Sequence, residues 1–445
     1  MNEIDKTLIE VREAVEIRDQ TSAWLRAFES ALAGGDEAGL ANLFTPDGNW
    51  RDILAFTWHL TPVVGAGAIA QGLLARQPAV GARSFAIAAG RTAPRRVKRM
   101  GRECIEAIYA FETNVGRCAG LLRLVPATDG GGAAGLKATV ISTSLEELKG
   151  FEERIGDRRP SGAAYSRNFG GDNWADVRRK AQDYDGRDPT VLIIGGAQAG
   201  LAIAARLNQL GVDNLVVEKW PRIGDSWRKR YHSLALHNSI NVNHLPYLPF
   251  PPTWPTYIPK DMLGLWFEFY AQVLEVNHWT STEFTRGEWD ERAKRWVATL
   301  KMEDGSQRIL RPRHIVFANG VSSYPLIPEI RGLDTFKGDV IHSEGFDSGA
   351  PYAGKNAIVI GTGSSANDIA LDLHSFGCRT TIVQRGSTTV VSIDPSAKLN
   401  YALYDEGPPI EDCDLIASAA TPPMILDAYK IAVRRMVELD HDMIE

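Results

Sequence analysis

LIIGGAQAG, residues 192–200, decides the fold class of this 445-residue chain. It joins a short apolar strand, Thr190–Ile194, to an amphipathic helix, which is the order of a dinucleotide-binding unit. Gly195 permits the tight turn, and Gly200 lets the helix pack closely on the strand. Ala197 stands where the fingerprint prefers glycine, a tolerable change to another small residue. The stretch predicts a Rossmann-type α/β unit.

A second stretch, GTGSSA at residues 361–366, repeats this pattern 166 residues later. In both units the residue that follows the second strand lies 23 positions after the first glycine. It is Glu218 in the first unit, a carboxylate that suits a ribose diol. In the second unit it is Gln384, followed by Arg385, which can hold a 2′-phosphate that an acid would repel. Two such sites suit a hydride transfer between FAD and NADPH, unless Arg385 is only a solvated surface charge.

Composition excludes several other classes of protein. The chain has 44% hydrophobic and 23% charged residues, as ordinary globular proteins do, and its net charge of −6 argues against a nucleic-acid binder. We expect no signal peptide and no membrane span, because no apolar run is long enough. The four cysteines have no CxxC or CxxxxC spacing, which excludes a metal knuckle and the redox-active dithiol of a disulfide reductase. We therefore expect a cytoplasmic protein without a metal site.

Residues 1–150 predict a separate α+β domain. Apolar residues at helical spacing predict a helix that ends at Gly34-Gly35, and Asp36 can cap a second short helix. TPDG at 45–48 reads as a turn, and residues 118–125 and 136–143 read as a long hairpin. The helical positions are Trp24, Leu25, Phe28 and Leu32.

The remaining chain is expected to hold three segments, of which residues 151–188 are a linker by composition. The family resemblance described below implies that residues 189–345 are the first segment of an FAD-binding domain and residues 346–445 an incomplete NADPH-binding domain. Strands of a meander precede a buried parallel strand that ends at Asn319-Gly320.

Three stretches carry a family resemblance: EKWPRIGDSWRKRYHSLALHN at 218–238, LPYLPFPPTWPTYIPK at 245–260 and FKGDVIHSEGF at 336–346. The third fits F-x-G-x-x-x-H-x-x-x-F. Together they resemble the flavin-containing monooxygenases, over about residues 188–445. Residues 1–150 resemble the NTF2-like cone fold. The expected fold class is thus α/β, with FAD- and NAD(P)-binding Rossmann-type domains preceded by an α+β cone domain. The motif residues are Phe336, Gly338, His342 and Phe346.

The resemblance implies an enzyme in which NADPH reduces FAD and the reduced flavin forms a C4a-hydroperoxide with dioxygen. A soft nitrogen or sulfur atom of a small organic substrate then attacks the distal oxygen. Phe346, where Baeyer–Villiger enzymes have Trp, favours this heteroatom chemistry over ketone oxidation, which remains an alternative. The protein is expected to position rings and exclude water.

The same resemblance assigns the candidate site residues. Asn238 and His342 are the candidates near the chemistry, although Asn238 could equally form a turn and His342 could orient a backbone turn. Contacts to FAD are expected from Gly195, Gly196, Ala197, Gln198, Gly200, Glu218, Lys219, Trp227, Arg228 and His237. Contacts to NADPH are expected from Gly361, Gly363, Ser364, Ser365, Gln384 and Arg385.

Two departures from the family pattern leave alternatives open. Ala318-Asn319-Gly320 replaces the familiar ATG, and the pattern continues past the region that matches Glu445. The chain is therefore truncated, completed by a partner, or an inactive flavoprotein or binding subunit. In the first domain Trp50, Asp52, Trp58 and His59 could line a pocket with Asp52 as an acid–base residue. The alternative is that this domain has no pocket of its own and serves as a packing or homodimerisation module.

Overall fold

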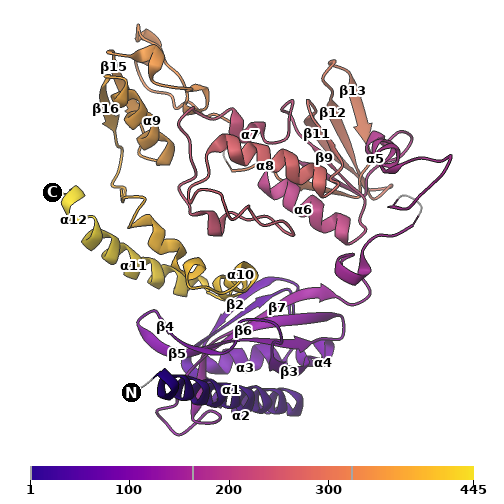
Figure 1. Ribbon diagram of the computed structural model, residues 1–445, viewed down its shortest axis with the longest axis vertical. Helices are drawn as coiled ribbons and strands as arrows, with labels where there is room; N and C mark the ends of the chain where they lie inside the picture. The colour runs from indigo at the N-terminus through magenta and orange to yellow at the C-terminus, as the bar shows by residue number, and fades with distance from the viewer. Residues whose placement is uncertain (1–2, 163–164, 322–323, 445) are drawn as a thin grey trace. The chain divides into compact units, whose positions relative to one another are not determined.

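Two compact units make up the protein, whose computed structural model describes residues 3–162, 165–321 and 324–444 (Figure 1). The first unit combines Met1–Glu152 with Val391–Glu445, and the second is Glu153–Val390. Within the described residues, no helix is both long and apolar enough to cross a membrane. The chain therefore leaves the first unit, builds the second, and returns to the first.

A curved antiparallel and parallel sheet forms the centre of the first unit. Its strands follow the order β2-β1-β7-β6-β5-β3, and β4 also pairs with β5. The hairpin expected at 118–125 and 136–143 is confirmed as β6 and β7, which pair antiparallel. The strands are β1 (Phe44–Ile53), β2 (Leu60–Val64), β3 (Arg83–Ile87), β4 (Arg95–Arg99), β5 (Arg102–Glu112), β6 (Gly116–Pro126) and β7 (Leu136–Leu148).

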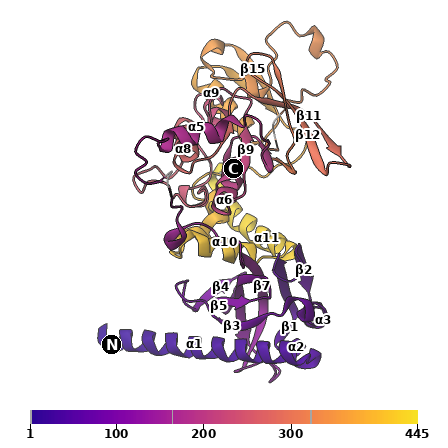
Figure 2. The ribbon, with the colours of Figure 1, turned by 90° about the vertical axis from the view of Figure 1, so that its right-hand side faces the viewer.

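Helices α1 (Glu3–Gly34), α2 (Glu37–Asn42), α3 (Ala66–Leu74) and α4 (Gln77–Val80) lie on one face of this sheet (Figure 2). Trp24 and Phe28 of α1 are fully buried against it, as their helical spacing predicted. Asp36 accepts a hydrogen bond from the Gly39 backbone N–H, which confirms the expected cap. The turn expected at 45–48 was wrong, because these residues form the irregular start of β1, where the pairing register shifts.

The opposite face of the sheet is covered by the end of the chain (Figure 1). Leu415, Ile416 and Ala419 are at most 6% exposed and pack with Ile108 and Leu121 of the sheet. The expected NADPH-binding segment 346–445 therefore differs from the observed division, which takes residues 391–445 into the first unit. The returning segment forms the 3-10 helix η7 (Ala397–Asp405), α10 (Ile410–Ser418), α11 (Pro422–Leu439) and α12 (His441–Ile444), and α10 packs on the sheet.

Hydrogen bonds and ion pairs hold this returning segment against the rest of the first unit. Asp412 is buried, and its carboxylate accepts hydrogen bonds from the Thr92 backbone N–H and hydroxyl and from Arg91. Glu406 pairs with Arg95 and Arg99, whose guanidinium groups also meet the buried Glu106. Because buried charges must be paired, these contacts show a built interface rather than loose packing.

The second unit contains a parallel sheet of order β10-β9-β8-β14. Alternate residues of its central strands face opposite layers: Ile193 and Val216 pack on helices, while Leu192 and Leu215 pack on the meander β11-β12-β13. These parallel strands are apolar on both faces because both faces are covered. The elements are β8 (Val191–Ile194), β9 (Asn214–Val217), β10 (His278–Trp279), β11 (Glu283–Asp290), β12 (Arg295–Lys301), β13 (Gln307–Leu310), β14 (His314–Phe317), α5 (Trp174–Asp183), α6 (Gln198–Gln209), α7 (Asp225–Arg228) and α8 (Lys260–Val273).

The second glycine stretch lies in a smaller part of the same unit. Strands β15 (Asn356–Ile360) and β16 (Arg379–Val383) pair in parallel, and α9 (Ser364–Ser375) connects them. This is one βαβ element, as expected. Short 3-10 helices occupy the connections: η1 (Gly156–Arg158), η3 (Ile240–Val242), η4 (Leu333–Thr335), η5 (Ser343–Gly345) and η6 (Ala350–Tyr352).

Candidate functional site

The first glycine loop closes so tightly that side chains are excluded at two positions. Gly195 has φ of +109°, and a Cβ built there would lie 2.6 Å from the Ala318 carbonyl oxygen. A Cβ on Gly200 would lie 1.9 Å from the Gly195 carbonyl oxygen. Both distances are far below van der Waals contact, so these positions require glycine for the reasons the fingerprint predicts.

Helix α6 begins directly after this loop. Its N-cap residue is Ala197, which offers no side-chain oxygen to the first backbone N–H groups of the helix. A 12-residue helix has a positive N-terminal end, and an uncapped end next to glycines can accept a phosphate. Gln198, the first residue of α6, accepts a hydrogen bond from the Trp227 indole N–H at 3.3 Å. The structure thus brings Trp227 to the loop.

Glu218 directly follows β9 beside the loop and is only 6% exposed. Its Oε2 accepts a hydrogen bond from the Gly196 backbone N–H at 2.8 Å, and its Oε1 accepts one from the Trp220 backbone N–H at 3.0 Å. These bonds fix the carboxylate beside the loop, and its expected contact to a ribose diol stays a prediction.

Lys219 and Arg228 lie in different surroundings. The Lys219 ammonium lies 5.0 Å from the centre of the Trp220 ring. Arg228 is mostly buried and binds the carboxylates of Asp225 and Glu268 and two backbone carbonyl oxygens. Arg228 therefore ties α7 to α8 in this structure, and its expected contact to a flavin stays a prediction.

The second loop repeats the backbone geometry of the first. The Gly361 N–H donates to the Val383 carbonyl oxygen at 2.9 Å, and the Gly195 N–H donates to the Val217 carbonyl oxygen at the same distance. Gly361 has φ of +121°, in the left-handed region that favours glycine. Gly363 is the N-cap of α9, so Ser364 and Ser365 form its first turn.

Gln384 and Arg385 follow β16 and are exposed. The Gln384 amide donates to the Gly386 carbonyl oxygen. Arg385 therefore has solvent access at the place where a 2′-phosphate would lie in the fingerprint.

His237 and Asp368 meet across the two nucleotide elements, which the sequence did not predict. His237 Nε2 lies 3.0 Å from Asp368 Oδ2, and the Tyr231 hydroxyl donates to the same oxygen at 2.5 Å. Asp368 follows the second loop within α9, and that proximity is the one signal the sequence offers. The partners lie 131 and 137 residues away, so only the fold identifies them.

The remaining candidates near the chemistry have local backbone contacts. The Asn238 carbonyl oxygen accepts a hydrogen bond from the Asn243 amide at 3.1 Å. His342 is half-buried, and its Nδ1 accepts a hydrogen bond from the Glu344 backbone N–H at 3.1 Å. Phe346 of the same motif is 4% exposed and packs in an apolar cluster. The structure thus gives His342 the turn-orienting contact considered above.

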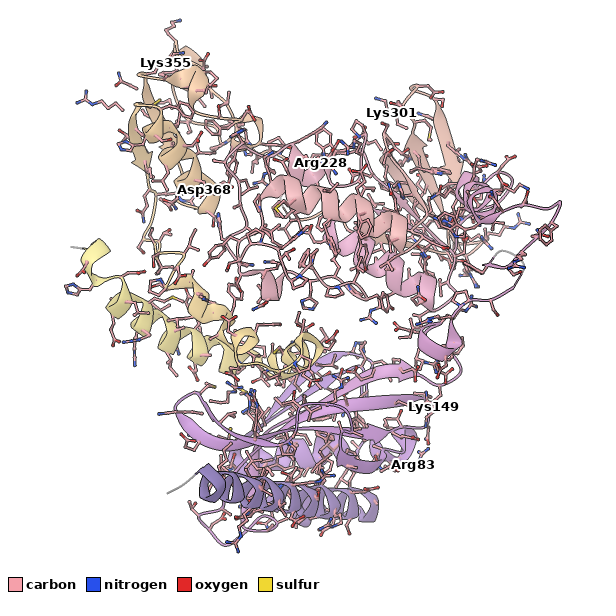
Figure 3. The ribbon with its side chains drawn as sticks, in the orientation of Figure 1. Arg83, Lys149, Arg228, Lys301, Lys355 and Asp368 are labelled. Atoms are coloured by element: carbon pink, nitrogen blue, oxygen red, sulfur yellow. The ribbon has the colours of Figure 1, made fainter. Side chains whose placement is uncertain are left out.

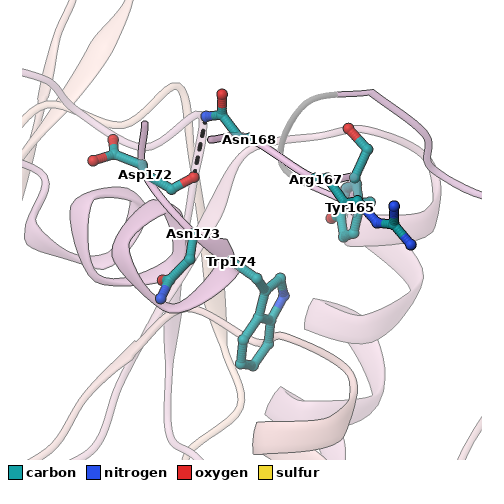
Figure 4. Close-up of a pocket in the computed structure, with 7 residues that line it drawn as sticks. Tyr165, Arg167, Asn168, Asp172, Asn173 and Trp174 are labelled. Carbon is teal, nitrogen blue, oxygen red and sulfur yellow. Dashed lines mark hydrogen bonds between the residues drawn. The ribbon is translucent and has the colours of Figure 1, made fainter. Parts of the chain in front are cut away.

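Two surface hollows lie apart from the loops themselves. One is lined by Lys219, Trp220, Ser281 and residues of the meander, next to Glu218. The other lies in the expected linker, and Tyr165 and Trp174 are among the residues that line it (Figure 4). Both side chains donate hydrogen bonds to Glu275. Within the described ranges, no group of His, Cys, Asp and Glu side chains could hold a metal ion.

The candidates of the first unit do not form an open pocket. Asp52 is fully buried, and its carboxylate accepts hydrogen bonds from Phe56, Thr57 and Thr143. Trp50 is also fully buried, whereas Trp58 and His59 are exposed. Asp52 therefore stabilises the loop after β1.

Comparison with known proteins identifies the relatives of the second unit. Residues 189–402 match the family model of the pyridine nucleotide-disulphide oxidoreductases. The chain is 31% identical over 207 residues to a probable indole-3-pyruvate monooxygenase of Arabidopsis thaliana, covering 46% of this chain and 54% of that protein. It is 33% identical over 204 residues to an indole-3-pyruvate monooxygenase of Oryza sativa subsp. japonica, covering 46% and 49%. The chain spans about half the length of the curated relatives it matches.

The comparison with solved structures also finds two flavoenzymes. A flavin-containing monooxygenase from Stenotrophomonas maltophilia has 23% identity and a TM-score of 0.43, covering 52% of this chain and 69% of that one. A cyclohexanone monooxygenase has 23% identity and a TM-score of 0.40, covering 49% and 43%. Structural similarity at this level says nothing about activity. The sequence relatives confirm the resemblance to flavin-containing monooxygenases, and the family model matches residues 189–402 as a pyridine nucleotide-disulphide oxidoreductase domain.

Proposed function

We propose that this chain, which resembles the flavin-containing monooxygenases and whose residues 189–402 match the pyridine nucleotide-disulphide oxidoreductase model, is an NADPH- and dioxygen-dependent flavin monooxygenase. The observation that carries the proposal is the pair of glycine loops with the same closing hydrogen bond and different residues after the second strand. FAD and NADPH are the cofactors that the family match and the relatives imply.

FAD is proposed to bind at the first loop. Gly195 and Gly200 leave room for backbone to approach a pyrophosphate, and the uncapped α6 stabilises its charge. Glu218 is already held by two backbone N–H groups and would accept from the ribose hydroxyls. Bound FAD would supply the redox chemistry with dioxygen, while the chain's own residues bind, orient and exclude water.

NADPH is proposed to bind at the second loop. Ser364 and Ser365 lie in the first turn of α9, where hydroxyl and backbone N–H groups can donate to a pyrophosphate. Arg385 would bind the 2′-phosphate with two parallel hydrogen bonds, and Gln384 would not repel it.

The proposed substrate is a small organic molecule with a soft nitrogen or sulfur atom. The relatives named above act, by their names, on indole-3-pyruvate, and ketone oxidation stays the alternative for this chain. Phe346 is a packed core residue and thus a weak guide to the substrate. A cytoplasmic location, an NTF2-like first domain and a homodimer stay predictions.

The visible absorption spectrum of the purified chain tests the proposal. We expect bound oxidised flavin that bleaches on addition of NADPH without oxygen and recovers under air. Amines, sulfides and ketones would then be screened for NADPH consumption coupled to product. A colourless chain that FAD cannot reconstitute would contradict the proposal and leave an inactive or binding subunit.

Arg385→Ala tests the assignment of the second loop. We expect the dissociation constant for NADPH to rise at least about tenfold and that for NADH to stay unchanged, because one guanidinium–phosphate pair is lost. Arg379→Ala is the matched control, an exposed arginine at the start of the same strand. If Arg385→Ala weakened the binding of NADPH and NADH equally, the assignment of Arg385 to the 2′-phosphate would be contradicted.

A further inference from the structure

One carboxylate joins the helix of the second glycine loop to the segment that follows α7. The Tyr231 hydroxyl and His237 Nε2 both reach Asp368 Oδ2, at 2.5 and 3.0 Å. Tyr231 is 2% exposed, and burial together with Asp368 raises its pKa, so the phenol keeps its proton and donates. Because the acceptor is a carboxylate, this is a charge-assisted hydrogen bond, which is stronger than a neutral one.

Asp368 is well placed to affect the second loop. It is the fifth residue of α9, one turn after Ser364, and Figure 3 labels it on that helix. Closer to the loop, the Arg230 guanidinium donates to the Ser365 hydroxyl at 3.4 Å. The segment after α7 therefore contacts the first two turns of α9 at two points.

An apolar cluster continues the same interface beneath these polar contacts. Tyr231 and Leu234 pack with Ile369, Leu373 and Cys378, all at most 8% exposed. Apolar packing holds α9 against the segment after α7 without selecting one relative position. The shared carboxylate does select one position, because hydrogen bonds are directional. The buried cysteine also offers a chemical probe of whether the interface is closed.

We propose that Asp368 is a positioning residue that holds the second glycine loop in register with the first nucleotide element, through Tyr231 and His237. The inference rests on the proposed function, because its consequence is efficient hydride delivery from NADPH to FAD. A misplacement of reacting groups by about 1 Å can cost on the order of 100-fold in rate, so a small shift of α9 would slow hydride delivery.

Three variants and one matched control test the proposal in the full chain. Tyr231→Phe removes the donor, Asp368→Ala removes the acceptor, and Asp368→Asn keeps an acceptor oxygen without the charge. The control is Asp372→Asn, one turn further along α9, whose carboxylate accepts from the Gly349 backbone N–H. The reduction of bound flavin by NADPH is followed in a stopped-flow instrument without oxygen, and reduction by dithionite is followed in parallel.

We expect Tyr231→Phe and Asp368→Ala to slow reduction by NADPH at least about tenfold at saturation. Asp368→Asn should be slowed less, since it still accepts from Tyr231. Reduction by dithionite and retention of FAD should stay within twofold in all variants, and the control should match the wild-type chain. Equal loss with NADPH and dithionite would show only a structural role and would overturn the proposal.

Alkylation of Cys378 gives a readout that needs no cofactor. Its rate, measured by mass spectrometry, should rise at least about fivefold in Asp368→Ala and Tyr231→Phe. Cys104 and Cys118 are internal controls, because burial raises the pKa of both thiols, that of Cys118 to about 12. If the wild-type chain binds no FAD, the proposed function fails by itself. The role of Asp368 is then tested by the alkylation rate of Cys378 and by the NADPH affinity from a fluorescence titration. If neither value differs between the variants and the wild-type chain, the proposal is overturned.

Discussion

Gly200 is the position of the first glycine loop with the least room for a side chain. In an open helix, replacing glycine by alanine stabilises by up to about 1 kcal/mol. Here the added Cβ would lie 1.9 Å from the Gly195 carbonyl oxygen, so α6 must move away from β8. We expect Gly200→Ala to lose bound FAD, measured as the flavin absorbance per chain after gel filtration.

Gly67→Ala is the matched control for this change. Gly67 lies in α3 with nothing within 4 Å of a built Cβ, so the variant should keep its flavin and its stability. Full flavin occupancy in Gly200→Ala would contradict the role assigned to the close contact.

Residues whose role depends on local geometry could be predicted from the sequence, and residues that depend on distant partners could not. Gly195, Gly200 and Glu218 lie where a short pattern requires them. Arg228 and Asp368 carry no such pattern, because their partners lie 40 and 137 residues away for the contacts to Glu268 and Tyr231.

At the scale of the elements, the packing of α10 on the sheet of the first unit is the contact that the sequence did not predict. Ile416 is 2% exposed and packs against the sheet of the first unit. Removing three carbon atoms from a buried isoleucine leaves a cavity, so Ile416→Ala should lower the free energy of unfolding by about 2–4 kcal/mol. Hydrogen exchange of peptides from β6 and β7 in increasing urea measures this for the first unit alone.

The control for α10 is Ile431→Ala on α11, where the side chain is 50% exposed. We expect it to change the free energy of unfolding by less than about 0.5 kcal/mol. Similar effects of the two variants would mean that α10 does not cover the sheet.

The covering of this sheet had one sequence signal. The run CAGLLRLV at 118–125 is almost continuously apolar, and its strand is buried on both faces in the structure. A hairpin with one solvated face would alternate instead. The run therefore indicates a second covering layer, but nothing local identifies residues 410–419 as that layer, since they are joined to it only through the fold.

At the scale of the whole molecule, the first unit contains a group of buried carboxylates that are paired with arginines. Glu106 is buried, and burial alone would raise its pKa, but hydrogen bonds and charges from Arg99 and Arg123 outweigh this and lower it to about 2. The returning segment adds Glu406 and Asp412, whose pKa values are also lowered, by Arg99 and by Thr92 with Arg91. The segment that closes the unit thus adds carboxylates that must be ionised in the folded state.

Acid should therefore weaken the first unit. A carboxyl whose pKa is lower in the folded state stabilises fully above its unfolded pKa of about 4.5, and this contribution is lost as pH falls toward the folded value. For Glu106 the contribution is about 3 kcal/mol, lost between about pH 4.5 and pH 2. Hydrogen exchange of β5 peptides across this range measures the loss within the first unit. Glu106→Gln should be less stable at pH 7, because Arg95, Arg99 and Arg123 each lose one charged partner. The variant should also lose less further stability on acidification. A variant whose stability falls as steeply as that of the wild-type chain between pH 4.5 and pH 2 would place the acid sensitivity at other carboxylates.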